Sequence, residues 1–164
     1  NVSIPAEAIL GEVGNGLQLL ELGINNGILA VSAEAVGAME VLYKTTVEYC
    51  KTREQFGQPI GKFQVLQHRM VDMFMEHEQA KSLLYMAALR MDGSDEVAAL
   101  KAISALKVQV GKGGRFVGQN AIQLHGGMGM TDELSVGHYF KRITAIETLF
   151  GNVDYHLKKY SRAA

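Results

Sequence analysis

Residues 60–91, "IGKFQVLQHRMVDMFMEHEQAKSLLYMAALRM", decide the fold class of this 164-residue chain. Apolar side chains recur in this stretch at steps of three and four residues, which places them on one face of an α-helix. We therefore predict a long amphipathic helix from about Ile60 to Met91, with this face in the core. The predicted core positions are Phe63, Leu66, Met70, Met73, His77, Ala80, Leu84 and Met91.

The segment before this helix has the same helical character. Residues from about Leu17 to Cys50 are rich in Ala, Leu, Val and Met, and include Gly23, Gly27 and Gly37. Glycines lower helix propensity but allow two helices to approach closely. We predict a long buried helix, with Glu34, Glu40, Lys44 and Glu48 on an exposed face that forms ordinary i,i+4 pairs.

The segment after residue 91 begins with a helix start signal. "MDGSDE" predicts a turn at Asp92-Gly93 and an N-cap at Ser94, with Asp95 and Glu96 in the first turn of a third helix that runs to about Leu124. After the glycine-rich break "HGGMGMTDELS", one or two shorter helices are expected between about Val136 and Tyr160. Long amphipathic segments joined by short turns predict an all-α, antiparallel (up-and-down) helical bundle.

The opening residues differ from the rest of the chain. "NVSIPAEAILGEVGNG" alternates like a strand and then turns on glycines. We interpret residues 1–14 as the tail of a preceding β domain or a linker, and residues 15–164 as the helical bundle domain. This chain is then expected to be part of a longer protein.

Composition and charge exclude several classes of function. The chain is 48% hydrophobic and 20% charged with a net charge of −1, so it lacks the basic surface that nucleic acids or acidic membranes attract. Glu34 and Glu40 interrupt the most apolar region, so no membrane span is expected. Cys50 is the only cysteine, which excludes an internal disulfide and a multi-cysteine zinc site. A buried thiol suits a reducing compartment, either the cytoplasm or, in a eukaryote, the mitochondrial matrix.

The usual site motifs are missing. Gly111, Gly113 and Gly114 lie within a helical pattern and do not follow a strand, so we interpret them as positions of close helix packing and not as a phosphate-binding loop. The five histidines form neither HExxH nor a pair of Glu-x-x-His motifs, and no metal site is predicted.

Two segments remain that composition does not explain. The first is Thr52 to Gln67, with Arg53-Glu54-Gln55-Phe56-Gly57 at its start, and the second contains Gln123-Leu124-His125-Gly126-Gly127-Met128-Gly129. In this order and helical context, the two resemble the Arg-x-x-Phe-Gly and Gln-x-x-Gly-Gly-x-Gly motifs of the flavin-dependent acyl-CoA dehydrogenases. The opening stretch is similar to the last strand of that family's middle β domain. The resemblance covers essentially the whole chain, as a C-terminal helical domain.

The resemblance implies a cofactor site. In that family the two motifs are presented to a neighbouring subunit, where they hold the adenosine diphosphate part of its FAD. The residues carried over are Arg53, Gln55, Phe56, Gln64, Gln123, Gly126 and Gly127. The residue types suit this role, because a guanidinium donates to phosphate oxygens, amides bind polar edges, and glycines let backbone N–H groups come close. The structural alternatives are a helix C-cap for Arg53 and core packing for Phe56.

The catalytic base is where the sequence departs from the resemblance. Many members of the family have a glutamate before a glycine in the last third of the domain, and that carboxylate removes the α-proton of the acyl thioester. Counted without gaps, the position falls on Phe150, before Gly151, and a phenyl ring accepts no proton. Members with the base on the first long helix would have it near Gly27, where there is also no carboxylate. Glu147, one helical turn before Phe150, is the weak remaining candidate.

Three functions therefore stay open. The chain could belong to a working acyl-CoA dehydrogenase that acts on an acyl-CoA substrate and passes electrons to an acceptor flavoprotein. It could instead belong to a base-lacking subunit that grips FAD in a mixed oligomer. The third possibility, an unrelated helical interaction module, would make Arg53 and Gly126-Gly127 incidental. The first two imply a homo- or hetero-oligomer, a dimer or a tetramer.

Overall fold

The periodic stretch forms helix α2 (Gln64–Met91) in the computed structural model, which describes residues 1–163. The other four helices are α1 (Gly16–Thr52), α3 (Glu96–His125), α4 (Val136–Thr148) and α5 (Val153–Arg162). Short 3₁₀ turns occur at Ala6–Ala8, Ile60–Lys62 and Gly126–Met130. A hairpin of two-residue strands, β1 (Glu54–Gln55) and β2 (Gln58–Pro59), joins α1 to α2. The all-α prediction is confirmed.

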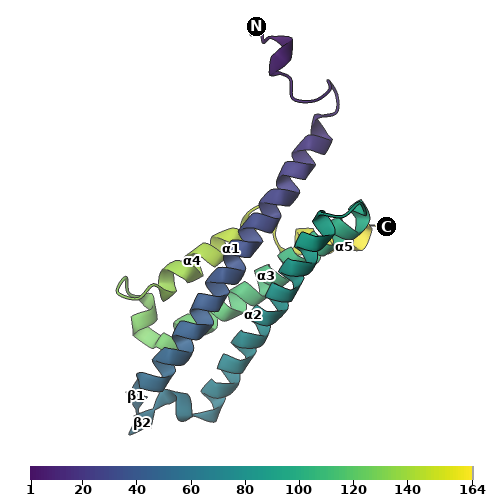
Figure 1. The fold of residues 1–164 in the computed structure, drawn as a ribbon. Coiled ribbons are helices and arrows are strands. Elements are labelled where there is room, and N and C mark those ends of the chain that lie inside the picture. The colour runs from purple at the N-terminus through teal and green to yellow at the C-terminus, as the bar shows by residue number, and fades with distance from the viewer. Residues whose placement is uncertain (164) are drawn as a thin grey trace.

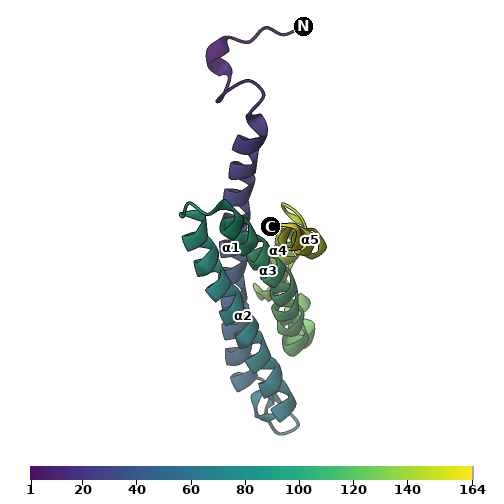
Figure 2. The same cartoon turned by 90° about the vertical axis from the view of Figure 1, so that its right-hand side faces the viewer.

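Helix α3 is the centre of the bundle. Figures 1 and 2 show α1 and α2 side by side and antiparallel, with α3 along them and with α4 and α5 on the other side of α3. The apolar core draws on four of the helices, with Met39 and Leu42 from α1, Met73 from α2, Leu106 from α3 and Ile146 from α4. The histidine of the predicted apolar face, His77, is fully buried in it.

Two predicted helix ends are wrong by a few residues. Helix α2 begins at Gln64 rather than Ile60, because Ile60–Lys62 form a 3₁₀ turn first. The N-cap of α3 is Asp95, whose Oδ1 accepts a hydrogen bond from the Ala98 N–H at 2.9 Å, and not Ser94. Both residue types cap well, but a carboxylate adds a favourable charge at the positive end of the helix.

The N-terminal part corrects two expectations. Residues 1–15 contain a 3₁₀ turn and no strand, because a lone strand has no partner for its backbone groups among the described residues. The first turns of α1, residues 16–23, are exposed and project beyond the bundle in Figure 1, so α1 is buried only in its later part. The division between a preceding β domain and the bundle at residue 14 stays a prediction.

The prediction that the helical glycines allow close packing is correct for some of them and wrong for others. A Cβ at Gly111, Gly113 or Gly114 would lie within 2.5 to 2.7 Å of Val153, Glu76 or Ile143, so these positions of α3 leave no room for a side chain. On α1, the same holds for Gly27. Gly23 and Gly37 have no atom within 4 Å of such a Cβ, so they do not serve helix approach within this chain.

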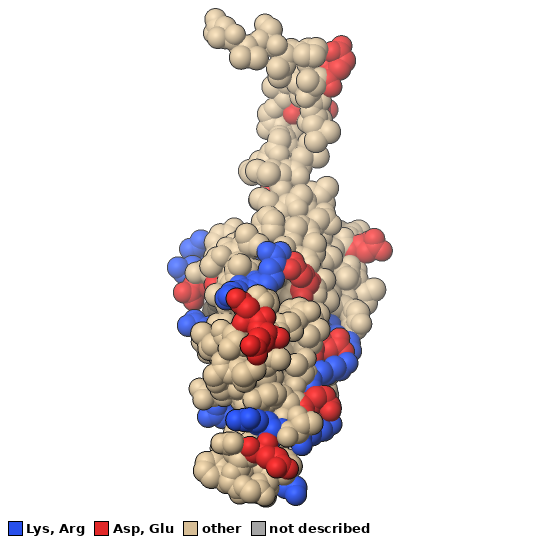
Figure 3. Space-filling model, turned by 90° about the vertical axis from the view of Figure 1, so that its left-hand side faces the viewer, with Lys and Arg blue, Asp and Glu red and all other residues tan. Residues whose placement is uncertain are grey.

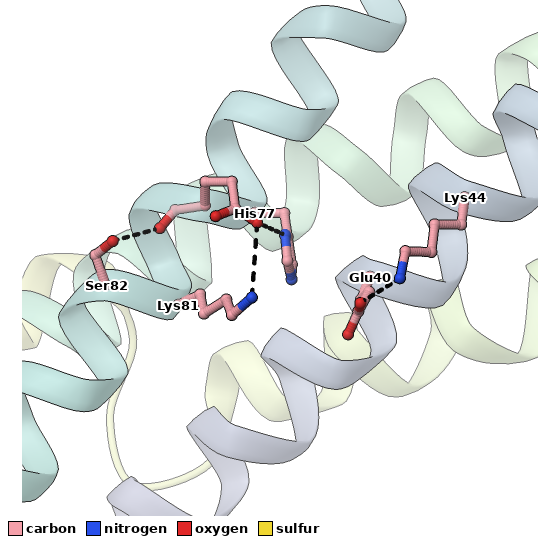
Figure 4. A network of polar contacts seen from close by, with 6 residues as sticks. Glu40, Lys44, His77, Lys81 and Ser82 are labelled. Carbon is pink, nitrogen blue, oxygen red and sulfur yellow. Dashed lines mark hydrogen bonds and ion pairs between the residues drawn. The ribbon is translucent and has the colours of Figure 1, made fainter.

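Figure 4 shows polar contacts along α1 and along α2. Lys44 pairs with Glu40 on α1, as predicted, and on α2 the Nδ1 of His77 lies 3.0 Å from an oxygen of Glu78. Glu34 does not pair along its own helix but binds Arg142 of α4 through two hydrogen bonds. Cys50 is buried, and burial raises the pKa of its thiol, in agreement with an unreactive cysteine.

Charges of both signs are mixed over the bundle face in Figure 3, whereas the projecting end of α1 shows no Lys or Arg. The sequence has none before Lys44. Among the described residues, only α1 is long and apolar enough to cross a membrane by length and composition, a test that core helices of globular bundles also pass.

Candidate functional site

The two unexplained sequence motifs meet in space. A cleft of about 430 Å³ lies between the C-terminal end of α1, the hairpin, and the C-terminal end of α3. It is lined by Tyr49, Arg53, Gln55, Ile60, Gln123, Leu124, His125, Gly126, Gly127 and Met128. Residues that lie about 70 positions apart in the sequence thus form one concave surface. Five of the seven predicted cofactor residues are among them.

The hairpin explains the local sequence of the first motif. Glu54 pairs with Pro59 and Gln55 with Gln58, and the two loop residues Phe56 and Gly57 have φ values of 54° and 77°. Positive φ at both central residues is the geometry of a tight two-residue turn that matches the twist of the strands. Glycine adopts it freely, whereas a bulky residue such as Phe56 is strained there, by about 1–3 kcal/mol. Strain of this kind is concentrated at functional sites.

Arg53 stands between α1 and the hairpin. It is the C-cap residue of α1, with its N–H donating to the Tyr49 carbonyl at 2.8 Å, while its own carbonyl accepts from the Ile60 N–H at 2.8 Å. The backbone is therefore fixed on both sides. The side chain is exposed and forms no ion pair or hydrogen bond with the described residues. Its planar cation is available to an external anion, although the C-cap role foreseen as the structural alternative is also present.

The end of α3 supplies the second wall of the cleft. Gly126 has a φ of +62°, a conformation that ends the helix and that side chains rarely adopt. Neither Gly126 nor Gly127 has an atom within 4 Å of a built Cβ, so their backbone borders open space. Gly129 is different, because a Cβ there would lie 3.0 Å from the Ile122 carbonyl oxygen. The first two glycines thus leave the backbone accessible, and the third permits a close turn.

His125 is a cleft residue that the motif comparison missed. Its ring stacks on Tyr49 with centroids 4.3 Å apart, and its Nδ1 lies 2.8 Å from the Ala121 carbonyl oxygen. Burial lowers the pKa of this imidazole, with the hydrogen bond to Ala121 opposing. Because a carbonyl oxygen only accepts, Nδ1 carries a proton and donates it to Ala121. The buried Nε2 has no hydrogen-bond partner among residues 1–163.

Phe56 and Gln64 do not line the cleft. The Phe56 side chain is 92% exposed at the tip of the hairpin, in edge-on contact with Phe63 at a centroid distance of 6.0 Å, so simple core packing does not explain it. Gln64 is the exposed first residue of α2. Both lie on the surface, and their roles as cofactor residues stay predictions.

Counting without gaps put the family's base at Phe150 or near Gly27, and these two parts of the chain lie against each other. Phe150, with a φ of 57°, lies in the turn between α4 and α5, and a Cβ at Gly27 of α1 would be only 2.8 Å from its Cζ. The phenyl ring therefore packs on the bare backbone of α1. A carboxylate is absent from both positions at this contact.

Glu147 has a different environment. Its Oε1 accepts a weak hydrogen bond from the Val153 N–H at 3.4 Å, and its Cγ would lie 3.5 Å from a Cβ at Gly111. It borders a hollow of about 560 Å³ between α3, α4 and the start of α5, which also includes Lys112 and Arg115. The Glu147 side chain thus contacts α3 and α5, whereas the Phe150 ring contacts α1. Among the described residues, no group of three or more possible ligands could hold a metal ion.

Comparison with known proteins agrees with this arrangement. The family described as "Acyl-CoA dehydrogenase, C-terminal domain" matches residues 14–164. The chain is 35% identical over 148 residues to the short-chain specific acyl-CoA dehydrogenase of Megasphaera elsdenii, covering 89% of this chain and 38% of that protein. This chain therefore spans well under half the length of that relative.

Solved structures share the fold. The FAD complex of PigA superimposes with a TM-score of 0.74 at 32% identity, over 80% of this chain and 34% of that one. The ChsE4-ChsE5 complex from Mycobacterium tuberculosis superimposes with a TM-score of 0.80 at 27% identity, over 85% of this chain and 37% of that one. With its two motifs joined in one cleft and its whole helical bundle matched, this chain belongs to the acyl-CoA dehydrogenase family, as a C-terminal domain of that family.

Proposed function

We propose that this domain contributes to FAD binding across a subunit interface in a flavin-dependent acyl-CoA dehydrogenase. The observation that carries the proposal is the single cleft that joins Arg53 and Gln55 to Gln123, Gly126 and Gly127. These side chains and backbone groups are exposed at the end of the bundle and open outward. A surface of this kind suits a ligand that is held mainly by another chain, so an oligomer follows from the proposal.

The residue types fit the adenosine diphosphate part of FAD. Arg53 would donate to the diphosphate oxygens, the amides of Gln55 and Gln123 would bind polar edges, and the two glycines would admit the ligand close to the backbone. When bound, FAD supplies the acceptor for the hydride that leaves an acyl-CoA thioester. Electrons would then pass to an acceptor flavoprotein.

The test is the FAD content of the full protein after Arg53→Ala. A hydrogen bond between charged groups contributes about 1.5–3 kcal/mol, so FAD affinity is expected to fall by roughly tenfold or more. Arg90→Ala is the matched control, because Arg90 is also exposed on a helix but lies at the far end of α2. Flavin absorbance per mole of protein measures the result. Equal FAD retention in both variants would refute the role of this cleft.

A second candidate is a base-lacking subunit of a mixed oligomer. The packing of Phe150 on Gly27 favours it, because this contact fills both expected base positions with groups that accept no proton. Such a subunit would keep the FAD-gripping surface and leave acyl-CoA oxidation to a partner subunit. The similarity to a chain of the ChsE4-ChsE5 complex supports an assembly of two kinds of chain.

A further inference from the structure

Lys107 is a lysine whose side chain lies in the interior of the bundle and not at the surface. It lies on the core face of α3 and is 1% exposed. Its Nζ donates three hydrogen bonds, to the carbonyl oxygens of Ile146 at 3.1 Å, Glu147 at 2.8 Å and Gly151 at 2.9 Å. A lysine ammonium has three donors, so all of them are used. The arrangement joins the centre of the bundle to the end of α4 and to the turn after it.

The three carbonyls make this burial tolerable. Ile146 and Glu147 belong to the last turn of α4, where carbonyl groups have no partner in their own helix and carry the negative end of its dipole. Burial lowers the pKa of Lys107, with the Glu147 carboxylate opposing. An apolar residue would avoid that desolvation cost. The lysine at this position is therefore best explained by its hydrogen bonds to the three carbonyl groups.

The segment it holds is a strained turn. Phe150 has a φ of 57° and Gly151 a φ of 102°, and only glycine adopts such values readily. The Phe150 carbonyl accepts a hydrogen bond from Nε2 of buried His156 at 3.1 Å, and the next carbonyl, of Gly151, accepts from Lys107. Two successive carbonyls are thus anchored from α5 and α3. The side chain at position 150 is left directed toward Gly27 of α1.

We propose that Lys107 is a positioning residue, which clamps the α4–α5 turn and thereby fixes the side chain at position 150 against α1. Its consequence for catalysis rests on the proposed function, because position 150 is where a family base would stand. The structural claim, that Lys107 holds the α4–α5 turn in place, is independent of the proposed function. Without the ammonium, three carbonyls lose their donor and the strained backbone at Phe150 relaxes.

The position of the Phe150 ring is the direct readout. The full protein is labelled with 4-fluorophenylalanine, and the ¹⁹F resonance of Phe150 is identified by its loss in Phe150→Leu. In Lys107→Met, which keeps the apolar stem, we expect this resonance to shift and broaden, while those of Phe116 and Phe140 stay in place. Lys112→Met, an exposed lysine of the same helix, is the matched control and should change none of them.

An unchanged Phe150 resonance in Lys107→Met, or an equal change of all three resonances, would overturn the proposal. Lys107→Gln serves if the methionine variant does not fold, because an amide donates two hydrogen bonds without charge. It should displace the Phe150 resonance by less, and a spectrum identical to wild type would equally count against the clamp. FAD content is recorded alongside. Its loss in Arg53→Ala tests the flavin site alone, so the two proposals fail separately.

Discussion

At the scale of single residues, the turn at Phe150 and Gly151 combines positive φ values with two anchored carbonyl groups. A left-handed conformation costs a bulky residue about 1–3 kcal/mol and persists only where its surroundings impose it. Here Lys107 and His156 hold the two carbonyls. A side chain at position 150 is therefore aimed at α1 in a fixed direction, whatever its chemistry.

This geometry makes Phe150→Glu the informative substitution for catalysis. It places a carboxylate at the Gly27 contact, so we expect the full protein, with FAD, to gain or accelerate flavin bleaching by acyl-CoA under anaerobic conditions. Glu147→Gln removes the basicity of the other candidate. Loss of a general base slows a reaction by about 10² to 10⁴. Because Glu147 contacts α3 and α5 instead, we expect this variant to bleach at the wild-type rate with FAD retained.

The opposite pattern would assign the base differently. A fast wild type that becomes slow in Glu147→Gln would make Glu147 the base and rule out a base-lacking subunit. A wild type that bleaches quickly, with no change in either variant, would place the base outside both positions. A silent wild type with activity in Phe150→Glu supports the mixed oligomer.

The sequence predicted part of this site through motif spacing. Arg53, Gln55 and Gln123 could be found because each belongs to a short pattern in a helical context. His125 lay inside the second pattern but had no matching role, and its place in the cleft depends on stacking with Tyr49, 76 residues away in the chain. Lys107 was missed because its partners are backbone carbonyls, which leave no residue-type signal. Its place on an apolar helix face was the only available hint.

At the scale of elements, glycines of α3 set how closely α4 approaches. A Cβ at Gly118 would lie 2.6 Å from Cδ2 of Phe140, so Gly118→Ala must displace the Phe140 ring or the helix that carries it. We expect a loss of about 1–3 kcal/mol in the free energy of unfolding, reduced by the better helix propensity of alanine. Denaturation in urea, followed by circular dichroism of the full protein, measures the change.

Gly37→Ala is the matched control for this prediction. It makes the same substitution within a helix, but no atom lies within 4 Å of the new Cβ. The free energy of unfolding should rise by about 0.5–1 kcal/mol, since alanine loses less backbone entropy. Stabilisation by both substitutions would mean that α3 and α4 are less closely packed than the structure shows.

Helices were easier to predict than the segments that join them. The three- and four-residue steps in residues 60–91 reflect burial along a whole helix, and many residues contribute to the signal. The hairpin at Glu54–Pro59 depends on two backbone angles at Phe56 and Gly57, and phenylalanine is not a residue that predicts positive φ. The strand expected in residues 1–14 failed for another reason, because strands need a partner that local sequence does not reveal.

At the scale of the whole molecule, three buried histidines make stability depend on pH. Burial lowers the pKa of His77, His125 and His156 below the ordinary value of 6.5. The unfolded chain therefore binds more protons in mildly acidic solution than the folded one. We expect the free energy of unfolding to fall as pH decreases through 6.5 and to level off below the folded pKa values. The slope is at most about 1.4 kcal/mol per pH unit for each histidine.

Urea denaturation of the full protein between pH 7.5 and 5 measures this dependence. His156→Gln removes one titrating group. The pKa of this imidazole is lowered mainly by burial, and the positive charges of Lys107 and Lys159 lower it further. The slope should then decrease. Equal slopes in the wild type and in His156→Gln would show that this histidine does not resist protonation.

The outward face of α2 bears on the assembly of the molecule. Val71, Met75, Tyr85 and Leu89 are exposed large apolar or aromatic residues, at spacings that place them along one side of the helix. Exposed apolar stripes of this kind mark interfaces, and FAD binding across subunits also requires one. We predict that the full protein is a dimer or a tetramer and that Met75→Lys with Leu89→Lys lowers its mass in light scattering. Thr144→Lys, at an exposed position on α4, should keep the wild-type mass. A monodisperse wild-type monomer would contradict both the interface and the FAD proposal that depends on it. Unchanged mass in the double variant would instead place the interface on another face, with FAD binding across subunits still open.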